Sequence, residues 1–417
     1  MRLTSLPQRV DKVGVFLADR ELGLLTRGSA HHYQPSQIGQ NISLTMTRPT
    51  LDGYSSGALH PIFAQNLPEG FNRRFIAERL ARYANVDDMY LLALQGENGI
   101  GMLSYSTDFE LPEVESITLE DILHYKGEDP LFPQLLEKYY LRNTLAGVQP
   151  KVGINATERT VEQPKVGINA TERTVEQPDL IVKSFDHEFP LLTVNEFVCM
   201  EAARHCGLEP PTVYLSENLE TFVVERFDRP DQQLLGYEDF TTLMKRPNTP
   251  DAKYLGSYES LLEATYLYTN SLSEVLKMYR YIVFNCLIGN GDAHLKNFAL
   301  QYSPDMKHIF VSPPFDITHT VIYDTIDDKM ALKIKGSKVF PNKADLIDLA
   351  TSKSFRLRGV EDIIENTANG ILEYIEQSNH VGMLQGLRES ITESVSRTMV
   401  VNSSAQPYRH DKKRKYE

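Results

Sequence analysis

The chain has 417 residues, of which 41% are hydrophobic and 24% are charged, and its formal net charge is -13. A chain of this length predicts two or three structural units, each able to bury its own core. Electrostatic binding to nucleic acid or to anionic membranes grows with the number of phosphates that a protein neutralises, so this charge argues against both.

The cysteines Cys199, Cys206 and Cys286 form neither a paired framework nor a metal-ligand spacing. We therefore expect no disulfide, no zinc site and a reducing compartment. The first residues lack a continuous hydrophobic region, and no stretch of the sequence is long enough to span a bilayer. The sequence thus predicts a cytoplasmic protein with no membrane partner.

The beginning of the chain is predicted to be β-rich. Residues 12–25 show the pattern of two short strands joined by a turn. Apolar residues at helical spacing within 62–84 then indicate a pair of helices interrupted at Pro68-Glu69-Gly70. Residues 105–140 are acidic, poorly periodic and contain prolines at 112, 130 and 133, so we predict a domain junction there.

A perfect tandem copy follows, because residues 149–162 recur letter for letter as residues 163–176. Solenoid architectures need several diverged units, so this is not a repeat fold. An in-frame duplication explains the second copy without assigning a function to it. Each copy can form a strand, a turn and a return strand, from which we expect that one copy is extruded as a surface loop.

Beyond the copies, the pattern predicts a small mixed sheet with one helix and then a mostly helical region from Ser257 onward. The expected elements of the sheet are a strand over 179–183, a helix over 192–206 that ends at Gly207, and a hairpin of strands 212–215 and 221–225. In the helical region we expect a helix over 275–288 and short strands near 298–301, 309–311 and 330–334. A β-rich lobe followed by a helical lobe is a layout in which nucleotide binds at the crevice.

The candidate catalytic loop is residues 288–298, Ile-Gly-Asn-Gly-Asp-Ala-His-Leu-Lys-Asn-Phe. Asp292 stands five positions before Asn297, the spacing of the base and a magnesium-binding asparagine in protein kinases. A bare match of this kind is more often a polar turn in which the aspartate is a cap. Its place between an apolar helix and an apolar strand favours phosphoryl transfer. We interpret His294 as a brace of the loop and Lys296 as a cation near the transferred phosphate.

Asp316 is the candidate for a second magnesium-binding carboxylate. It follows a short predicted strand and lies nineteen residues after Asn297, the order in which kinases keep this ligand. The alternative is a loop aspartate that caps a helix.

Lys183 and Glu196 have the order of a phosphate-binding lysine and its ion-pair partner, the first at a strand end and the second in the next helix. Taken singly, a strand-end lysine usually snorkels and a helix glutamate usually faces solvent. Their order and spacing, and not either residue, support the assignment.

Two further segments suit a nucleotide. The strand that ends at Val224–Arg229 lies where the lobes would join, so the backbone of Glu225–Phe227 would face adenine. An ordinary strand end with an Asp-Arg pair is equally compatible with these residues. The segment Ala146–Lys151 would be the turn that covers the phosphates, although it lacks the G-x-G-x-x-G of eukaryotic kinases.

Taken in chain order, these motifs resemble the HipA-like serine/threonine kinases, the toxin halves of bacterial toxin-antitoxin pairs. The resemblance covers nearly the whole chain and also includes residues 13–25, 63–70, 237–240 and 330–334. It implies an α+β, bilobal protein-kinase-like fold with a β-rich N-terminal lobe and a mostly helical C-terminal lobe. The implied domains are an extra N-terminal subdomain (1–125), an N-lobe with phosphate loop and hinge (126–229), a helical C-lobe (230–402) and a flexible tail (403–417).

The resemblance also implies the cofactors ATP and Mg²⁺ and the roles of individual residues. Asp292 would be the catalytic aspartate, assisted by Lys296, and Asn297 and Asp316 would bind magnesium. The family carries an autophosphorylated serine just before the phosphate loop, and Thr144 occupies that position here. The residues implied to contact ATP are Gly147, Val148, Gln149, Lys151, Lys183, Glu225, Arg226, Phe227, His294, Asn297 and Asp316.

The implied partner is a small, HipB-like helix-turn-helix antitoxin, so that contact with DNA would be mainly indirect. The family's characterised targets include glutamyl-tRNA synthetase, whose phosphorylation inhibits translation. Two other readings stay open: a catalytically silent co-repressor that acts with its antitoxin, which the duplication favours, and a small-molecule phosphotransferase, from which the β-rich beginning of the chain points away.

Overall fold

The computed structural model describes residues 6–37, 41–46, 53–109, 111, 114–115, 117–142, 150–154, 158–161, 173–176, 179–184, 188–230, 233–247, 249–326, 328–351 and 355–400. These residues form two compact units. The first unit draws on residues 1–197, 211–252 and 299–313, and the second on residues 198–210, 253–298 and 314–417. The predicted division at 125, 229 and 402 stays a prediction.

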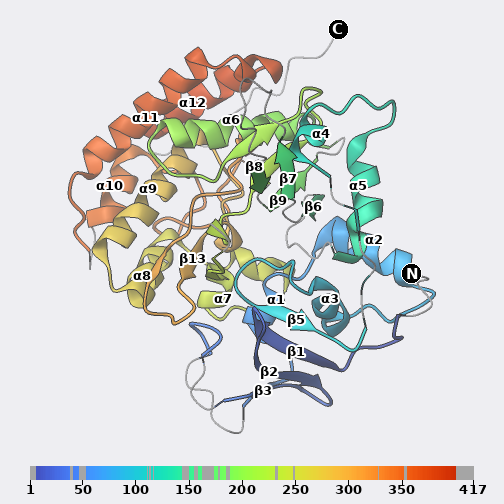
Figure 1. Cartoon of the computed structure of the whole chain (residues 1–417). Helices are drawn as coiled ribbons and strands as arrows, with labels where there is room; N and C mark the ends of the chain where they lie inside the picture. Colours follow the sequence, from blue (N-terminus) through green and yellow to red (C-terminus); the bar gives the residue numbers. More distant parts are fainter. Residues whose placement is uncertain are drawn as a thin grey trace. The chain divides into compact units, whose positions relative to one another are not determined.

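The first unit begins with a five-stranded antiparallel sheet in the order β4-β3-β2-β1-β5 (Figure 1). Its inner strands bury alternate apolar side chains, as β-sheets with one covered face do. The predicted pair of strands within 12–25 is confirmed. The strands are β1 (Lys12–Leu17), β2 (Arg20–Arg27), β3 (His31–Pro35), β4 (Tyr54–Ser56) and β5 (Ser104–Ser106).

The predicted helix pair near this sheet is also confirmed. It consists of α1 (Pro61–Ala64) and α2 (Gly70–Leu80), and the break falls at the predicted Pro-Glu-Gly segment, where Gly70 has a φ of 51°. Glycine enters this region of backbone space without a steric cost. The next helix, α3 (Asp88–Gln95), starts at the side-chain cap of Asp87 and is buried over nearly its whole length.

A four-stranded antiparallel sheet in the order β10-β11-β9-β6 forms the second layer of this unit, and all its predicted strands are present. They are β6 (Lys151–Ile154), β9 (Leu180–Lys183), β10 (Val213–Leu215) and β11 (Phe222–Glu225). The predicted helix is α6 (Leu192–His205), and Gly207 follows it with a φ of 71°. The register of β6 and β9 sets Lys151 opposite Lys183.

Two helices lie within residues 105–140, where the sequence shows little periodicity, and the domain junction predicted there stays a prediction. They are α4 (Leu119–Leu123) and α5 (Leu131–Tyr139). Apolar side chains of α5 pack against Val152, Val182 and Val223 of the four-stranded sheet. Proline obscured the helix in the sequence, yet Pro133 lies in its first turn, where a missing N–H costs no helical hydrogen bond.

The duplicated segment divides between two sheets. Residues 151–154 of the first copy form β6, whereas β7 (Glu158–Val161) of the first copy pairs with β8 (Arg173–Glu176) of the second. The expectation that each copy forms its own hairpin is therefore wrong, because the two return strands pair with each other. Residues 155–157 and 162–172 lie outside the described part of the chain.

A third sheet of the first unit contains β12 (Gly236–Asp239), β13 (Ala299–Tyr302) and β14 (Ile309–Val311), and α7 (Phe240–Leu243) follows β12. The last two strands match the predicted positions. Glu238 on β12 is fully buried, and its carboxylate accepts hydrogen bonds from Ser43 Oγ at 2.9 Å, Leu44 N at 2.6 Å and Tyr302 Oη at 2.8 Å. One carboxylate therefore fastens the 42–46 segment to this sheet.

The second unit is helical, as predicted from Ser257 onward (Figure 1). Its centre is α9 (Leu272–Ile288), which packs against α8 (Tyr258–Thr269), α11 (Val360–Gln377) and α12 (Leu387–Met399), while α10 (Lys343–Thr351) packs against α11. In the described part of the chain no helix is long and apolar enough to cross a bilayer.

Short 3-10 turns occur in both units. They are η2 (Tyr140–Arg142), η4 (Pro250–Tyr254), η5 (Leu295–Asn297), η6 (Thr320–Ile322) and η7 (His380–Met383).

The prediction of a strand near 330–334 is wrong. Met330, Ala331 and Leu332 are all buried, so the segment has no polar face of the alternating kind. Its backbone instead makes single loop contacts, including Met330 N to Lys338 O at 2.8 Å and Tyr258 N to Lys333 O at 2.9 Å. The run of apolar residues here reflects burial and not pairing with a neighbouring strand.

Burial raises the pKa of Glu238 to about 7 from its usual 4.5. Because the folded pKa exceeds the unfolded one, the contribution of this carboxyl to stability is lost as pH rises from about 4.5 through about 7. We expect Glu238→Gln to remove a pH-dependent loss of about 3 kcal/mol in the free energy of unfolding. Urea unfolding of both chains at pH 5 and pH 8 measures this, and equal pH dependence in the two chains would contradict it.

Candidate active site

The candidate catalytic loop starts where α9 ends. Gly289 ends the helix in the left-handed region with a φ of 78°. Carbonyls at this helix end, which have no partner within the helix, are bound by a later segment, since His319 Nδ1 lies 2.5 Å from Ile288 O and Thr320 N donates to Gly289 O at 3.2 Å. Thr320 Oγ1 also accepts from Gly291 N at 2.7 Å. The turn before Asp292 is thereby held by two consecutive side chains that sequence analysis did not single out.

Asn297 and Asp316 are brought together as predicted. Asn297 Oδ1 accepts from His294 N at 3.1 Å, and its Nδ2 donates to Asp316 Oδ2 at 2.7 Å. Asp316 itself has a φ of 57°, a left-handed conformation that is uncommon for a residue with a Cβ. Such conformations cost energy and persist only where the surrounding structure holds them, and they are concentrated at functional sites.

Asp292 is exposed at the surface of its unit. Desolvation by the surrounding protein nevertheless raises the pKa of its carboxyl to about 6. Lys253 and the hydroxyl of Tyr254 lower that pKa, and Asp316 raises it. A carboxyl with a pKa close to neutral, between a cation and a second carboxylate, suits a proton acceptor.

His294 and Lys296 lie inside the same loop. His294 is buried, and burial together with Lys253 lowers the pKa of its ring to about 3, so the ring is neutral. Its predicted role as a brace of the loop stays a prediction. Lys296 is half-buried in the 3-10 turn η5 that carries Asn297.

The oxygens available to a metal ion are those of the Asn297 amide and the Asp316 carboxylate. Among the described residues there is no group of three or more histidine, cysteine, aspartate or glutamate side chains that could hold a metal. A pair of oxygen ligands nonetheless fits magnesium, which usually keeps several waters and binds through one or two protein groups plus phosphate oxygens. Since Asn297 Nδ2 faces Asp316 in this structure, the amide would have to turn its oxygen toward the metal.

In the first unit, Lys183 and Glu196 form the predicted ion pair. Lys183 Nζ lies 2.5 Å from Glu196 Oε1, and the two side chains are 7% and 0% exposed. Lys183 Nζ also lies 5.8 Å from the centroid of the Phe222 ring. A buried pair of this kind is costly unless each charge is compensated, so both the helix and the strand are needed to keep the ammonium in place.

The other phosphate-loop candidates are only partly described. Lys151 on β6 is buried and faces Lys183 across the ladder, which puts two predicted nucleotide residues on neighbouring strands. Gly147, Val148 and Gln149, together with Thr144, lie outside the described residues. Their roles stay predictions.

The segment predicted to face adenine is bound mainly to its own unit. Glu225 N donates to Thr212 O and Arg226 N to Asp179 O, each at 2.9 Å, and Phe227 O accepts from Gln301 Nε2 at 3.1 Å. The N–H groups of Glu225 and Arg226 are therefore committed to backbone carbonyls. Any adenine contact would have to use other atoms of this segment.

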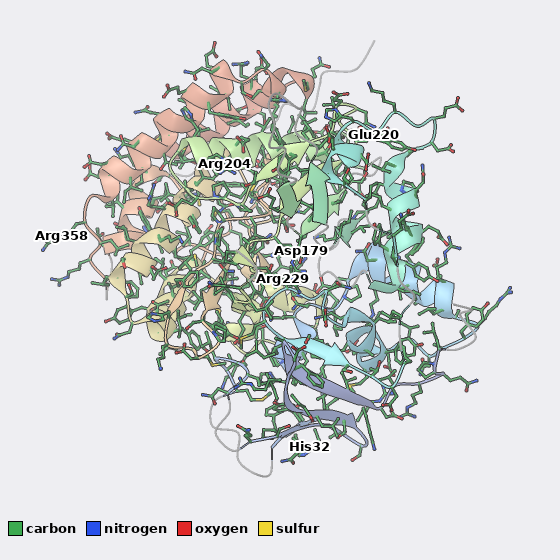
Figure 2. All side chains as sticks on the ribbon, viewed as in Figure 1. His32, Asp179, Arg204, Glu220, Arg229 and Arg358 are labelled. Atoms are coloured by element: carbon green, nitrogen blue, oxygen red, sulfur yellow. The ribbon has the colours of Figure 1, made fainter. Side chains whose placement is uncertain are left out.

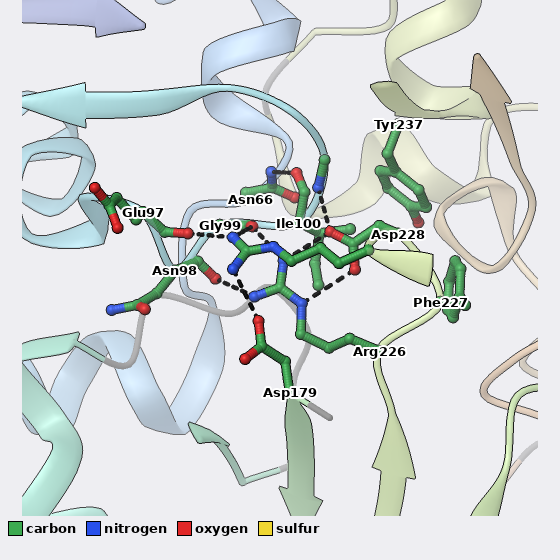
Figure 3. Close-up of polar contacts among 12 residues, drawn as sticks. Asn66, Glu97, Asn98, Gly99, Ile100, Asp179, Arg226, Phe227, Asp228 and Tyr237 are labelled. Carbon is green, nitrogen blue, oxygen red and sulfur yellow. Dashed lines mark hydrogen bonds and ion pairs between the residues drawn. The ribbon is translucent and has the colours of Figure 1, made fainter. Parts of the chain in front are cut away.

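The side chain of Arg226 points toward the loop between α3 and β5 and contacts the backbone of that loop (Figure 3). Its guanidinium binds the carbonyl oxygens of Asn98 at 3.0 Å and Gly99 at 2.5 Å and pairs with Asp228 at 2.7 Å. Asp228 also accepts from Gly101 N at 2.7 Å. The Asp-Arg pair that sequence analysis left open as a structural alternative is thus present, and it is buried.

Arg229 extends the same network. It pairs with Asp179 at 2.8 Å, and the two labelled residues lie side by side in Figure 2. Through its other nitrogen it binds the carbonyl oxygen of Glu97. Two arginines therefore fasten the strand end after β11 to the 97–101 loop.

We expect Arg226→Met to destabilise the chain by about 3–5 kcal/mol, because it leaves the carboxylate of Asp228 buried without its ion-pair partner. Arg9→Met is the matched control, since Arg9 pairs with Asp11 at the surface with exposed fractions of 58% and 45%. That control should change the stability by about 0–1 kcal/mol. Urea unfolding compares the two variants, and equal midpoints would contradict the structural role of Arg226.

The mixed sheets, the helical unit and the Asp292, Asn297 and Asp316 cluster define a kinase-like α+β protein of two lobes. Residues 143–375 match the model of the HipA-like C-terminal domain, and residues 13–106 match that of the HipA N-terminal domain. The chain therefore belongs to the family of HipA-like kinases.

Individual relatives agree with this family. A protein of Sinorhizobium fredii named as a kinase, Y4dM, is 27% identical over 327 residues, 74% of each chain. The serine/threonine-protein kinase toxin HipA of Shewanella oneidensis is 23% identical over 332 residues, 73% of each chain. The structure also matches Shewanella oneidensis HipA in a complex with HipB and operator DNA, with a TM-score of 0.66 and 19% identity over 92% of this chain and 97% of the other.

Proposed function

We propose that the chain is an ATP- and Mg²⁺-dependent serine/threonine protein kinase and the toxin half of a toxin-antitoxin pair. The observation that carries this proposal is the hydrogen bond between the two candidate metal ligands, Asn297 and Asp316, in the same unit as the candidate base Asp292, whose pKa the charge of Asp316 raises. Membership of the HipA-like kinases and the names of the relatives support it.

Each residue then has a role that its surroundings suit. Asp292 accepts the proton of the acceptor hydroxyl, which needs a carboxylate with a pKa not far below neutral. Asn297 and Asp316 would hold Mg²⁺, which when bound would neutralise charge on the phosphates. Lys183, held by Glu196, contacts the phosphates of ATP, and Lys296 stabilises charge that develops on the transferred group.

Phosphate transfer tests the proposal directly. We expect Asp292→Asn to lower transfer from labelled ATP by at least about a hundredfold, because it removes the proton acceptor, while ATP binding stays within about twofold. The exposed residue Asp324 provides the control variant Asp324→Asn, which should transfer phosphate at the parental rate.

Mapping of the labelled peptides would show whether Thr144 accepts phosphate and so takes part in an off-switch. A parental chain that folds but neither binds ATP nor transfers phosphate would overturn the kinase. The remaining candidate would then be the silent co-repressor, which the tandem duplication favours. Against that candidate stands the intact ladder of β6 and β9, which keeps Lys151 opposite Lys183.

The partners follow as part of the same proposal. The antitoxin would be a HipB-like helix-turn-helix protein that carries most of the DNA contact, in keeping with the net charge of -13 on this chain. The substrate class is a cytoplasmic protein such as glutamyl-tRNA synthetase. Incubation of that synthetase with the chain and labelled ATP, beside the Asp292→Asn variant, tests the substrate independently of self-phosphorylation.

A further inference from the structure

A tyrosine from a distant segment contacts the candidate base. Tyr254, at the end of η4, donates its hydroxyl to Asp292 Oδ1 at 3.3 Å. Among the described residues no other side chain donates a hydrogen bond to that carboxylate. The distance is long for an O–H···O bond, as catalytic hydrogen bonds often are before substrate binds.

The ring of Tyr254 is held by the catalytic loop and by two cations. The His294 ring meets it edge-on, with 5.5 Å between centroids and an interplanar angle of 73°. Lys253 Nζ lies 5.1 Å and Lys338 Nζ 5.8 Å from its centroid. These contacts involve the ring, whereas the contact with Asp292 involves the hydroxyl.

Lys253 adds a charge at the same place. Its side chain is only 7% exposed, and within the described ranges it forms no ion pair. A buried ammonium without a carboxylate at contact distance is costly, so its position needs compensation from nearby groups. The Tyr254 ring and the charge of Asp292 are the compensating groups that the structure supplies.

We propose that Tyr254 is a positioning residue for Asp292, an inference that rests on the phosphoryl transfer proposed above. Its hydroxyl fixes Oδ1, so that Oδ2 is left to accept the proton of the acceptor hydroxyl. In that step the acceptor oxygen bonds to the γ-phosphorus, the bond from that phosphorus to the bridging oxygen breaks to leave ADP, and the proton passes to Asp292. Lys253 and Lys338 hold the ring that carries the hydroxyl.

The variant Tyr254→Phe isolates the hydroxyl, because it keeps the ring and its contacts with His294 and the two lysines. We expect the single-turnover rate of phosphate transfer from labelled ATP to fall about tenfold, the loss typical of one hydrogen bond to a charged group. The dissociation constant for Mg-ATP, measured by calorimetry, and the melting temperature should not change. This split between rate and binding separates positioning from a general structural role.

The variant Tyr266→Phe is the matched control, since Tyr266 is a half-exposed tyrosine of α8 in the same unit and packs on Phe355. It should leave the rate unchanged. A second pair tests the cation: Lys253→Met should slow transfer several-fold, and Lys253→Arg, which keeps the charge, should restore most of the rate.

Three outcomes would overturn the inference. If the parental chain transfers phosphate and Asp292→Asn does not, but Tyr254→Phe stays within twofold of the parent, the kinase stands and the positioning role is wrong. If Tyr254→Phe weakens Mg-ATP binding or lowers the melting temperature in step with the rate, its role is structural. If the parental chain neither binds ATP nor transfers phosphate, the proposed function fails and this inference fails with it.

Discussion

The candidate active site depends on how a buried helix ends. The last carbonyl groups of α9 have no partners within the helix, and burial without partners would be costly. His319 and Thr320 supply those partners from the segment that also carries Asp316. The position of Asp292 and that of Asp316 are therefore set by one set of hydrogen bonds. A change in either segment reaches both carboxylates through the same backbone turn.

Much of this arrangement could be predicted from the sequence, because the decisive signals are local. The spacing of Asp292 and Asn297 lies within one turn, and Lys183 and Glu196 lie on consecutive elements. Tyr254 was missed because it meets Asp292 only through the fold, and no periodicity links two residues that far apart in the chain. The prediction of a strand near 330–334 was wrong for a related reason: apolar residues indicate that a segment is buried, but they do not show which groups its backbone pairs with.

Two buried ion pairs of the first unit illustrate why residue type alone does not define a site. Each pair includes a residue on or next to a strand, and its side chains are almost fully buried; the pairs are Lys183 with Glu196 and Arg226 with Asp228. The second pair also binds two backbone carbonyls and one backbone N–H of the 97–101 loop, so its donors are used within the fold. The sequence left both interpretations of Arg226 open, and only the direction of its guanidinium separates them.

The pairing of β7 with β8 explains how the sheet beside it tolerates a duplication. Identical strands that run antiparallel pair symmetrically about a centre, and here Thr160 lies opposite Thr174, its counterpart in the other copy. A tandem copy thus brings a strand together with a partner of matching length and pattern. Within the described residues, the backbone of β8 therefore pairs with β7 and does not take the place of β6 or β9 in their ladder. An unrelated insertion of equal length would carry no such partner and would expose an unpaired edge.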